Sequence, residues 1–583
     1  LIKRFYILNR KEILYLTILF IVCSLVLALR YAGIKGPDSD TAIFPLTALH
    51  LTQGKPFPFF FYGQDYNGTL PVFFMLILFK TLGVSYILVE LLYALVIAGV
   101  ITLFSAFLLR EINYFGVAIF AATFLLFPHG DAVSIVGLKN SMHSFSILLA
   151  LLSGYLFCWY VNKTIGENKH KTLIELVFPI FIFLFLAGLT FWSSKLGFLY
   201  LTIISFIGLF GCRKVLIRIF SESNPKAKNL ISSSFKYFSF HFKIIILVLV
   251  IFLSCYFMLL NPVGGYIQPK DLLSPKHLFN DSLQRKIQEN LIVPEILSAK
   301  KIDAHELDGV DFIVVAKKGF QRIKRNTLHV LKIYHYLFLN INKPFNLIWI
   351  LLPLLLGGYY YFSKRIEFLS LIKGDWAKVE FKWIIIFLPI LNILASLPTR
   401  FLANQDISYV RYFISINLAI LAVIPLFFSL IQSTKFRNTF LALYFFFAVG
   451  TFVYSKPNYY EGLIDIPSKI KFLKSRYPDN SRLSALEVDL LKFLEKEQLY
   501  FGYSNYWDSY RLTFLTHERF IISPRIGERM RYKPYDQLVK ISKHPFYLFR
   551  INEGADQKIL QKIYAMENNS FRQKKFGDKL LIY

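Results

Sequence analysis

The stretch "ILVELLYALVIAGVITLFSAFLL" at residues 87–109 decides the class of fold to which this chain belongs. A helix needs about 20 apolar residues to cross the hydrocarbon core of a bilayer, and this run is long enough to do so. Similar runs recur along the chain, and 55% of its 583 residues are hydrophobic and 17% are aromatic. That composition is typical of a membrane protein with several spans and excludes an ordinary soluble enzyme.

About eleven apolar segments are candidates for transmembrane helices. They lie near residues 12–30, 87–109, 114–128, 141–161, 173–190, 196–212, 243–261, 344–363, 382–397, 408–431 and 438–455. If the N-terminus is cytoplasmic and these spans alternate, the cytoplasmic loops carry most of the lysines and arginines, and the short outside loops carry few. The sequence therefore predicts an α-helical polytopic membrane protein with its N-terminus inside.

A further apolar stretch at residues 70–83 is short and contains Lys80. Counting it as a full span would invert the orientation of every later segment and destroy the charge asymmetry. We therefore expect a juxtamembrane helix here, lying at the outer face or entering it only in part.

This topology places three substantial regions outside the membrane: the loop 31–86, the loop 262–343 and the tail 457–583. Residues 1–456 form the predicted membrane domain. The tail alternates helix-like segments, such as "LEVDLLKFLEKEQ", with strand-like segments, such as "YFGYS" and "RFIISP", which predicts a small extracytoplasmic α/β domain. It lacks the glycine patterns of nucleotide-binding loops.

The net charge of the chain and the positions of its cysteines limit the kinds of partner and site that this protein can have. The net charge is +29, but the basic residues sit beside hydrophobic segments, which indicates contact with a lipid bilayer and excludes nucleic acid as a partner. The four cysteines lie in or at the edge of apolar stretches, so neither a disulfide framework nor a metal site is predicted. The first apolar segment is too long for a cleaved signal peptide.

The loop 31–86 contains carboxylate, imidazole and aromatic side chains, which are residue types used in catalysis and substrate binding. Apolar residues at helical spacing in 40–53 predict an amphipathic helix lying flat on the bilayer, with Asp40 at its start. A carboxylate at the membrane surface can act as a general base towards an acceptor hydroxyl or amine. Aspartate at a helix start is also a common N-cap, so the residue type alone leaves both interpretations open.

The run "FPFFFYGQDYNGTL" at residues 57–70 resembles a motif of the C-type glycosyltransferases (the GT-C fold), close to bacterial relatives of protein mannosyltransferases and aminoarabinose transferases. In that family an acidic pair opens the first outside loop. The resemblance implies that Asp40 and Asp38 are catalytic, although the family often has Asp-Glu where this chain has Asp40-Thr41. It also implies that the loop binds substrate through further polar side chains, namely His50, Tyr62, Gln64 and Tyr66.

Two further positions are candidates for substrate contacts. The run "YVRYF" at 409–413 resembles an Arg-Tyr pair that opens a late span in the family, and this implies that Arg411 contacts a lipid phosphate. Pairing with Asp406 at headgroup level is the alternative. Lys139 begins the span after "FPHGDAV" and could line the same cavity, or could belong to an ordinary polar loop.

The tail segment "GYSNYWDSYRLTFLTHERFIISP" at 502–524 resembles a signature that follows the membrane part in prokaryotic members of this group. Its aromatic residues offer flat faces for sugar stacking, or alternatively form the core of the small domain. They are Tyr503, Tyr506, Trp507 and Tyr510, with Asp508 and Arg511 as polar neighbours.

The resemblance implies an inverting transferase in the cell membrane, with its active site outside. The donor would be a sugar on a polyprenyl phosphate, and the acceptor a protein, a lipid or a glycan. Members of the family differ in their use of a divalent cation, so Mg²⁺ or Mn²⁺ stays open and no cofactor is certain. A polysaccharide ligase or polymerase relying on the loop 262–343 is an alternative. A transporter of lipid-linked sugars is another, but the two related halves expected of one are not seen.

Overall fold

The computed structural model describes residues 8–32, 37, 39–58, 60–109, 112–126, 141–166, 182–183, 185–190, 193, 414–431, 433–455, 482–525, 528–564 and 571–583. The chain divides into two compact units. The helical unit comprises Leu1–Leu27 and Leu95–Pro457, and the loop–tail unit comprises Ala28–Ala94 and Asn458–Tyr583. The loop–tail unit thus joins the first predicted outside loop to the C-terminal tail.

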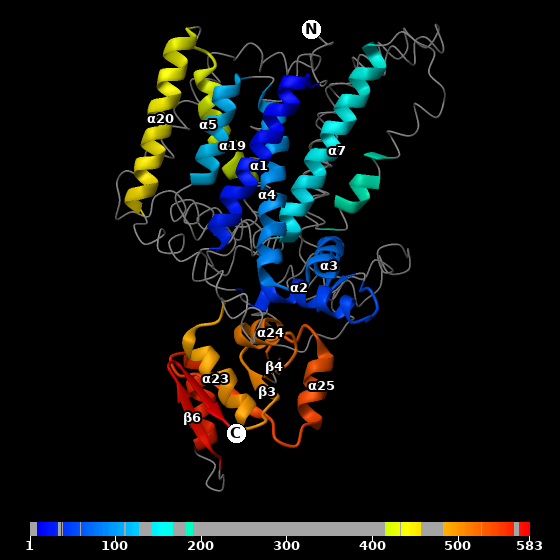
Figure 1. The fold of residues 1–583 in the computed structure, drawn as a ribbon, viewed down its shortest axis with the longest axis vertical. Helices are drawn as coiled ribbons and strands as arrows, with labels where there is room; N and C mark the ends of the chain where they lie inside the picture. Colours follow the sequence, from blue (N-terminus) through cyan, green and yellow to red (C-terminus); the bar gives the residue numbers. More distant parts are fainter. Residues whose placement is uncertain are drawn as a thin grey trace, which may run out of the picture. The chain divides into compact units, whose positions relative to one another are not determined.

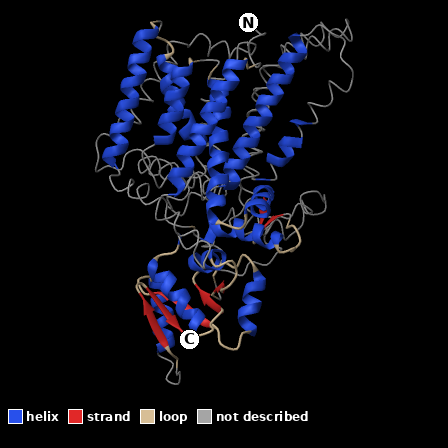
Figure 2. Cartoon of the chain, viewed as in Figure 1, coloured by secondary structure: helices blue, strands red, loops and turns tan. Residues whose placement is uncertain are grey.

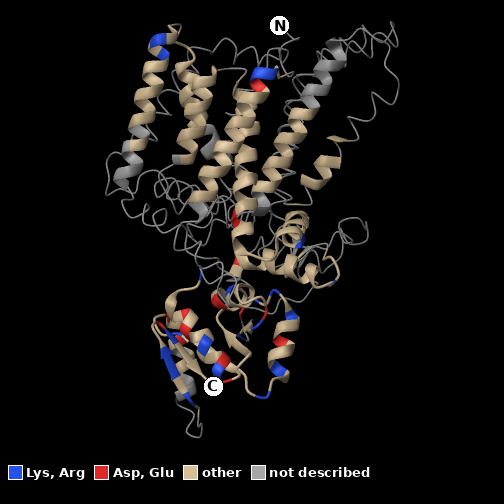
Figure 3. Ribbon diagram, viewed as in Figure 1, with Lys and Arg blue, Asp and Glu red and all other residues tan. Residues whose placement is uncertain are grey.

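Besides a few described helical residues between 182 and 193, the helical unit contains six described helices, and two of them continue into the loop–tail unit. They are α1 (Arg10–Ala32), α4 (Tyr86–Leu108), α5 (Tyr114–Leu126), α7 (Ser141–Gly166), α19 (Ile414–Phe428) and α20 (Thr434–Ser455). Helices α19 and α20 pack against α5 and against each other (Figure 1). Figure 3 shows that charged residues are scarce along α4 and α5, as expected of helices that pack in an apolar medium.

Two of the described helices are long and apolar enough to cross a membrane, Arg10–Leu29 and Tyr86–Leu108. Shorter apolar helices occur at Tyr114–Leu125 and Ser144–Leu156. Ile13, Leu14 and Leu25 on α1 are each more than half exposed, which favours contact with lipid over contact with water. The predicted spans at 196–212, 243–261, 344–363 and 382–397, and most of 173–190, lie outside the described residues.

The loop part of the loop–tail unit contains two helices and a small hairpin. Its elements are α2 (Ser39–Thr52), β1 (Phe60–Phe61), β2 (Gln64–Gly68) and α3 (Leu70–Leu82), and β1 pairs with β2 in antiparallel fashion. The 13 residues of α3 make a helix roughly 20 Å long, shorter than a hydrocarbon core of ~30 Å. That length agrees with the prediction that this stretch makes no full span.

The helix predicted over 40–53 is present as α2, but the prediction that it is amphipathic is wrong. Nearly every side chain from Ser39 to Leu51 is buried, including Ile43, Leu46 and Leu49. The helix packs against α3 on one side and against a helix of the tail on another. Periodicity could not reveal this, because the tail that covers α2 is remote in the sequence.

The tail forms a small domain of helices around one five-stranded sheet, as predicted (Figure 2). In chain order its elements are α23 (Ala485–Lys496), β3 (Phe501–Ser504), α24 (Tyr506–Leu515), β4 (Ile521–Pro524), α25 (Lys533–Ile541), β5 (Phe546–Arg550), α26 (Gly554–Tyr564), β6 (Gln573–Phe576) and β7 (Lys579–Ile582). The strand order is β4-β3-β5-β7-β6. The pairs β3–β4 and β3–β5 are parallel, whereas β7 is antiparallel to β5 and β6.

Local sequence signals explain where these helices begin. Ser484 and Glu487 form a reciprocal capping box at the start of α23. The side chain of Asn505 accepts a hydrogen bond from the backbone amide of Asp508 and caps α24 directly after strand β3. This cap fixes the point at which α24 leaves the sheet, and therefore the direction of the side chains in its first turn.

Candidate functional site

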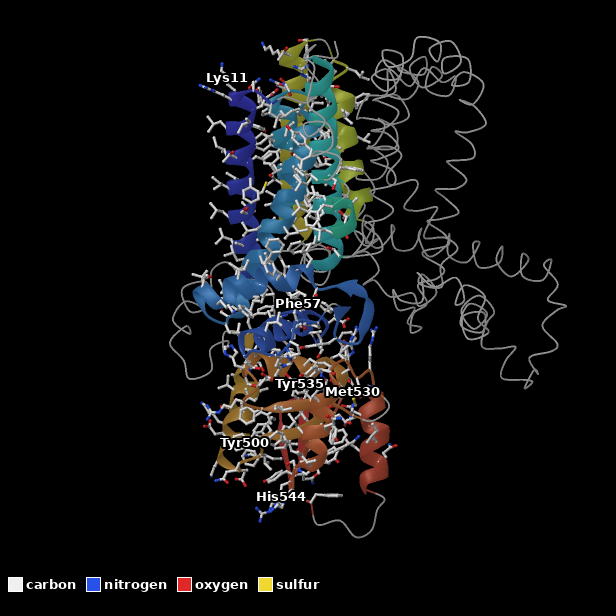
Figure 4. All side chains as sticks on the ribbon, turned by 90° about the vertical axis from the view of Figure 1, so that its right-hand side faces the viewer. Lys11, Phe57, Tyr500, Met530, Tyr535 and His544 are labelled. Atoms are coloured by element: carbon white, nitrogen blue, oxygen red, sulfur yellow. The ribbon has the colours of Figure 1, made fainter. Side chains whose placement is uncertain are left out.

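Helix α2 lies along α24, and a polar cluster connects each end of α2 to the tail. The carboxylate cluster at its N-terminal end consists of Asp40, Tyr506, Tyr510 and Arg531. The histidine cluster near its C-terminal end consists of His50, Tyr62, Glu518 and Tyr535. Figure 4 labels Tyr535, and also Met530 next to Arg531, at the end of the tail domain that faces α2. The two clusters are about 15 Å apart along the helix axis, at ~1.5 Å per residue.

Asp40 is the second residue of α2, and its side chain contacts the tail. Its Oδ1 accepts a hydrogen bond from the hydroxyl of Tyr506 and an ion-pair contact from Nη2 of Arg531 at 3.2 Å. The Asp40 side chain is 24% exposed, whereas that of Arg531 is only 3% exposed. The carboxylate is therefore fixed from the tail side and still partly open to solvent.

Arg531 connects three separate segments through its guanidinium group. Nε donates to the hydroxyl of Tyr506 at 3.1 Å, Nη1 donates to the carbonyl oxygen of Gly63 at 3.1 Å, and Nη2 contacts Asp40. The backbone amide of Arg531 donates to the hydroxyl of Tyr510 at 2.7 Å. Gly63 has a φ of +62°, and a Cβ there would come within 2.9 Å of the Arg531 backbone. Only glycine fits this turn without displacing Arg531.

The phenol of Tyr506 remains protonated in this environment. Burial raises its pKa well above the usual value, and the charge of Asp40 raises it further against the opposing effect of Arg531. A protonated hydroxyl can donate to the carboxylate while its oxygen accepts from Arg531. Two donors from the tail therefore converge on the same oxygen of Asp40.

In the histidine cluster, both ring nitrogens of a fully buried imidazole are engaged. His50 Nδ1 lies 2.9 Å from the hydroxyl of Tyr62, and Nε2 lies 2.9 Å from Glu518 and 3.0 Å from Tyr535. Tyr535 also donates to Glu518 at 2.7 Å. Because a carboxylate can only accept, we assign the proton of a neutral His50 to Nε2, so that Nδ1 accepts from Tyr62.

Protonation states in this cluster follow from burial and hydrogen bonding. Burial lowers the pKa of His50 despite the neighbouring Glu518, so the imidazole is neutral near pH 7. Burial also opposes the charge of Glu518. Donation from His50, Tyr535 and Gln53 outweighs that effect and lowers the pKa of Glu518 to about 2. The cluster is therefore an ionised carboxylate with several donors and a cationic partner, the ammonium group of Lys55 at 3.5 Å, whose side chain is 36% exposed.

The backbone that carries Glu518 is strained. His517 and Glu518 follow Thr516, the C-cap residue of α24, and have φ values of +50° and +61°, in the left-handed region that non-glycine residues rarely adopt. Each such residue costs on the order of 1 kcal/mol. The amide of Glu518 donates to the carbonyl of Thr513 at 2.9 Å, which fixes the turn. This conformation places the Glu518 carboxylate within hydrogen-bond distance of His50.

The structure therefore brings three of the sequence-predicted site residues, Asp40, His50 and Tyr62, into one unit. Asp40 and Tyr62 are partly exposed, but His50 has no exposed surface, so in this conformation it supports the loop and does not touch a substrate. The backbones of Gln64 and Tyr66 lie in β2. Asp38, Lys139 and Arg411 lie outside the described residues.

The aromatic residues of the tail signature divide into two groups. Tyr503, Tyr506 and Tyr510 are buried and belong to the core, whereas Trp507 is 46% exposed. Their polar neighbours are structural in the described unit: Arg550 binds Asp508 through two hydrogen bonds of 2.7 and 2.8 Å, and Arg511 binds Glu487 at 2.7 Å. These two pairs, with Lys579, fix α24 to the sheet.

Sequence reasoning did not assign Arg531, Glu518 or Tyr535 to the site. The partners of Asp40 are 466 and 491 positions away along the chain, and no local pattern indicates such a pairing. Glu518 stands inside the tail signature, so the signature was the only available signal. The aromatic residues of the signature suggested sugar stacking, and nothing in the signature indicated that Glu518 contacts the first loop.

No group of three or more His, Cys, Asp or Glu side chains within the described ranges could hold a metal ion. Comparisons of the chain with protein-family models, with curated proteins and with solved structures found no match. What the site can do chemically therefore rests on its own geometry: a partly exposed carboxylate, oriented by two donors, that can accept a proton.

Proposed function

We propose that this protein is an inverting membrane glycosyltransferase that moves a sugar from a polyprenyl phosphate to an acceptor on the outer face of the membrane. The observation that carries the proposal is the Asp40 carboxylate, which is partly exposed and oriented in the loop whose 57–70 run resembles the GT-C motif. A donor with a long lipid tail suits a chain with membrane-spanning helices, since the tail stays in lipid while the headgroup reaches water.

In the proposed reaction Asp40 takes the proton from the acceptor hydroxyl as the acceptor oxygen attacks the anomeric carbon of the donor sugar. The bond between that carbon and the phosphate oxygen breaks, and the polyprenyl phosphate leaves with the electron pair. Attack opposite the leaving group inverts the configuration. Asp38 would position the acceptor, and Arg411 would contact the departing phosphate, for which its forked donors are suited.

Replacing Asp40 by asparagine tests the proposal. Asp40→Asn keeps the size of the side chain but cannot take a proton, so turnover should fall on the order of 10²–10⁴-fold with normal folding and donor binding. Asp489→Asn is the matched control, because Asp489 is a carboxylate of α23 that is 63% exposed. If Asp40→Asn is active and Asp38→Asn is inactive, the base is Asp38. If both transfer sugar at the wild-type rate, the transferase proposal fails.

The proposed orientation has its own test. Cysteine introduced at the exposed position Lys543 should react with an impermeant maleimide in intact cells, whereas cysteine at the exposed position Lys11 should react only after permeabilisation. The background should lack the four native cysteines. Labelling of both positions, or of neither, in intact cells would contradict a tail that lies outside with the N-terminus inside.

A further inference from the structure

We infer that the tail domain supplies two positioning residues, Tyr506 and Arg531, that orient the Asp40 carboxylate for proton transfer. The inference rests on the proposed function, in which Asp40 is the base. It assigns to the tail domain a role in orienting the base, because both residues belong to the segment 482–583 and their target belongs to the first loop.

Tyr506 can point its hydroxyl in only one direction. It stands in the first turn of α24, directly after the Asn505 cap, and is 8% exposed. Its ring makes edge-on contacts with Trp507 and Tyr510 at centroid distances of 5.3 and 5.9 Å. A ring held on two faces in this way allows little rotation, so the hydroxyl that donates to Asp40 is fixed by the packing of the tail.

Arg531 is fixed even more strongly. Its guanidinium group bonds to Tyr506, Gly63 and Asp40, and its backbone amide bonds to Tyr510. Productive geometry at a catalytic group requires tolerances of about 0.5 Å, and supporting hydrogen bonds of this kind provide them. The orientation of the Asp40 carboxylate is thus determined from the tail and from the hairpin turn at Gly63 together.

The chemistry of the contact favours a positioning role over a purely structural one. Taking an ion pair out of water costs several kcal/mol, and apolar side chains of similar volume join two segments at least as well. The pair of Arg531 and Asp40 is also asymmetric, since the arginine is buried and the carboxylate is partly exposed. That arrangement holds an oriented carboxylate oxygen at a partly exposed position, which the mere connection of two segments does not require.

The test uses full-length protein in lipid nanodiscs with synthetic polyprenyl-phosphate hexoses and pentoses, measuring release or transfer of the sugar. Tyr506→Phe removes only the hydroxyl and should lower kcat on the order of 10-fold, with an unchanged KM for the donor. Arg531→Ala should lower kcat further. Added guanidinium should restore part of that loss, and Arg531→Lys should restore part of it as well because it keeps the charge without the fork.

Two matched controls separate positioning from general damage to the domain. Tyr503→Phe removes a buried tyrosine hydroxyl that contacts Asp536, and Arg519→Lys alters an ion pair with Glu495; both of these partners lie in the tail. Both should leave kcat within about twofold of the wild type. If Asp40→Asn is inactive but Tyr506→Phe and Arg531→Lys turn over at the wild-type rate, the inference is overturned while the proposed function stands. If Asp40→Asn is itself fully active, both fail.

Discussion

Glu518→Gln should lower the local stability of helix α2, although Glu518 and α2 lie in distant parts of the sequence. The Glu518 side chain is 12% exposed, accepts hydrogen bonds from His50, Gln53 and Tyr535, and also pairs with Nζ of Lys55 at 3.5 Å. Glutamine has nearly the same shape, but it carries no charge and replaces one acceptor oxygen by a donor group. At least one of the three donors would then face an NH₂ group in a site with little access to water.

The structure sets the size of the expected effect. A fall in the pKa of Glu518 from 4.5 to about 2 corresponds to an upper limit of ~3 kcal/mol at 1.36 kcal/mol per pH unit. Partial solvation of the carboxylate reduces this, so we expect a loss of about 2 kcal/mol at pH 7, within the range for hydrogen bonds to charged groups. Because the pKa is lowered in the folded state, this stabilisation is present above about pH 4.5 and disappears as the pH falls towards 2.

Amide hydrogen exchange of the full-length protein, followed by mass spectrometry, measures this effect locally. A loss of 2 kcal/mol should make the amides of α2 (Ser39–Thr52) exchange roughly 30-fold faster. Glu495→Gln is the control, because Glu495 pairs with Arg519 inside the tail and should leave α2 unchanged. Equal protection of α2 in the wild type and in Glu518→Gln would refute the claim that the histidine cluster fastens α2 to the tail.

Other substitutions test the packing of the tail, again by exchange of its own peptides. Gly502→Ala should destabilise the tail by about 1–3 kcal/mol, because a Cβ there would lie 2.5 Å from a neighbouring phenyl ring; Gly554→Ala, with nothing within 4 Å, should not. Asp508→Asn should cost about 1–3 kcal/mol, because it removes the charge of a buried carboxylate that accepts from Arg550, although Glu553 still pairs with Arg550 and Glu487 with Lys579; the exposed Asp489→Asn should have almost no effect.

Much of the tail could be predicted from sequence because its signals are local. The strand at Phe501–Ser504 is a short β-rich run, and the helix at Ala485–Lys496 has a capping box and a clear apolar periodicity. Helix α24 was not predicted, since its run "YWDSYRLTFL" drew attention as an aromatic motif. Its cap, Asn505, is a residue type that often starts helices, but the sequence prediction did not use it as a helix start.

Only the part of the candidate site that lies in the first loop could be predicted from the sequence. Asp40, His50 and Tyr62 stand close together in the sequence, so their residue types in one loop could be noticed. Their partners in the tail could not, because pairing across more than 450 positions leaves no periodicity in a single sequence. The same limit explains the error at α2, whose burial on all sides depends on a helix made from the far end of the chain.

The order in which this unit is synthesised follows from its two-part construction. Roughly 360 residues lie between Ala94 and Asn458, so the first loop leaves the ribosome long before the tail exists. At about 5–20 residues per second, α2 waits on the order of a minute for the partner that buries it. During that interval α3 can cover one side of α2, but the side that packs against α24 has no protein partner. We expect it to shelter in the lipid interface or on a chaperone, and to leave that shelter only when the last hundred or so residues of the chain have folded.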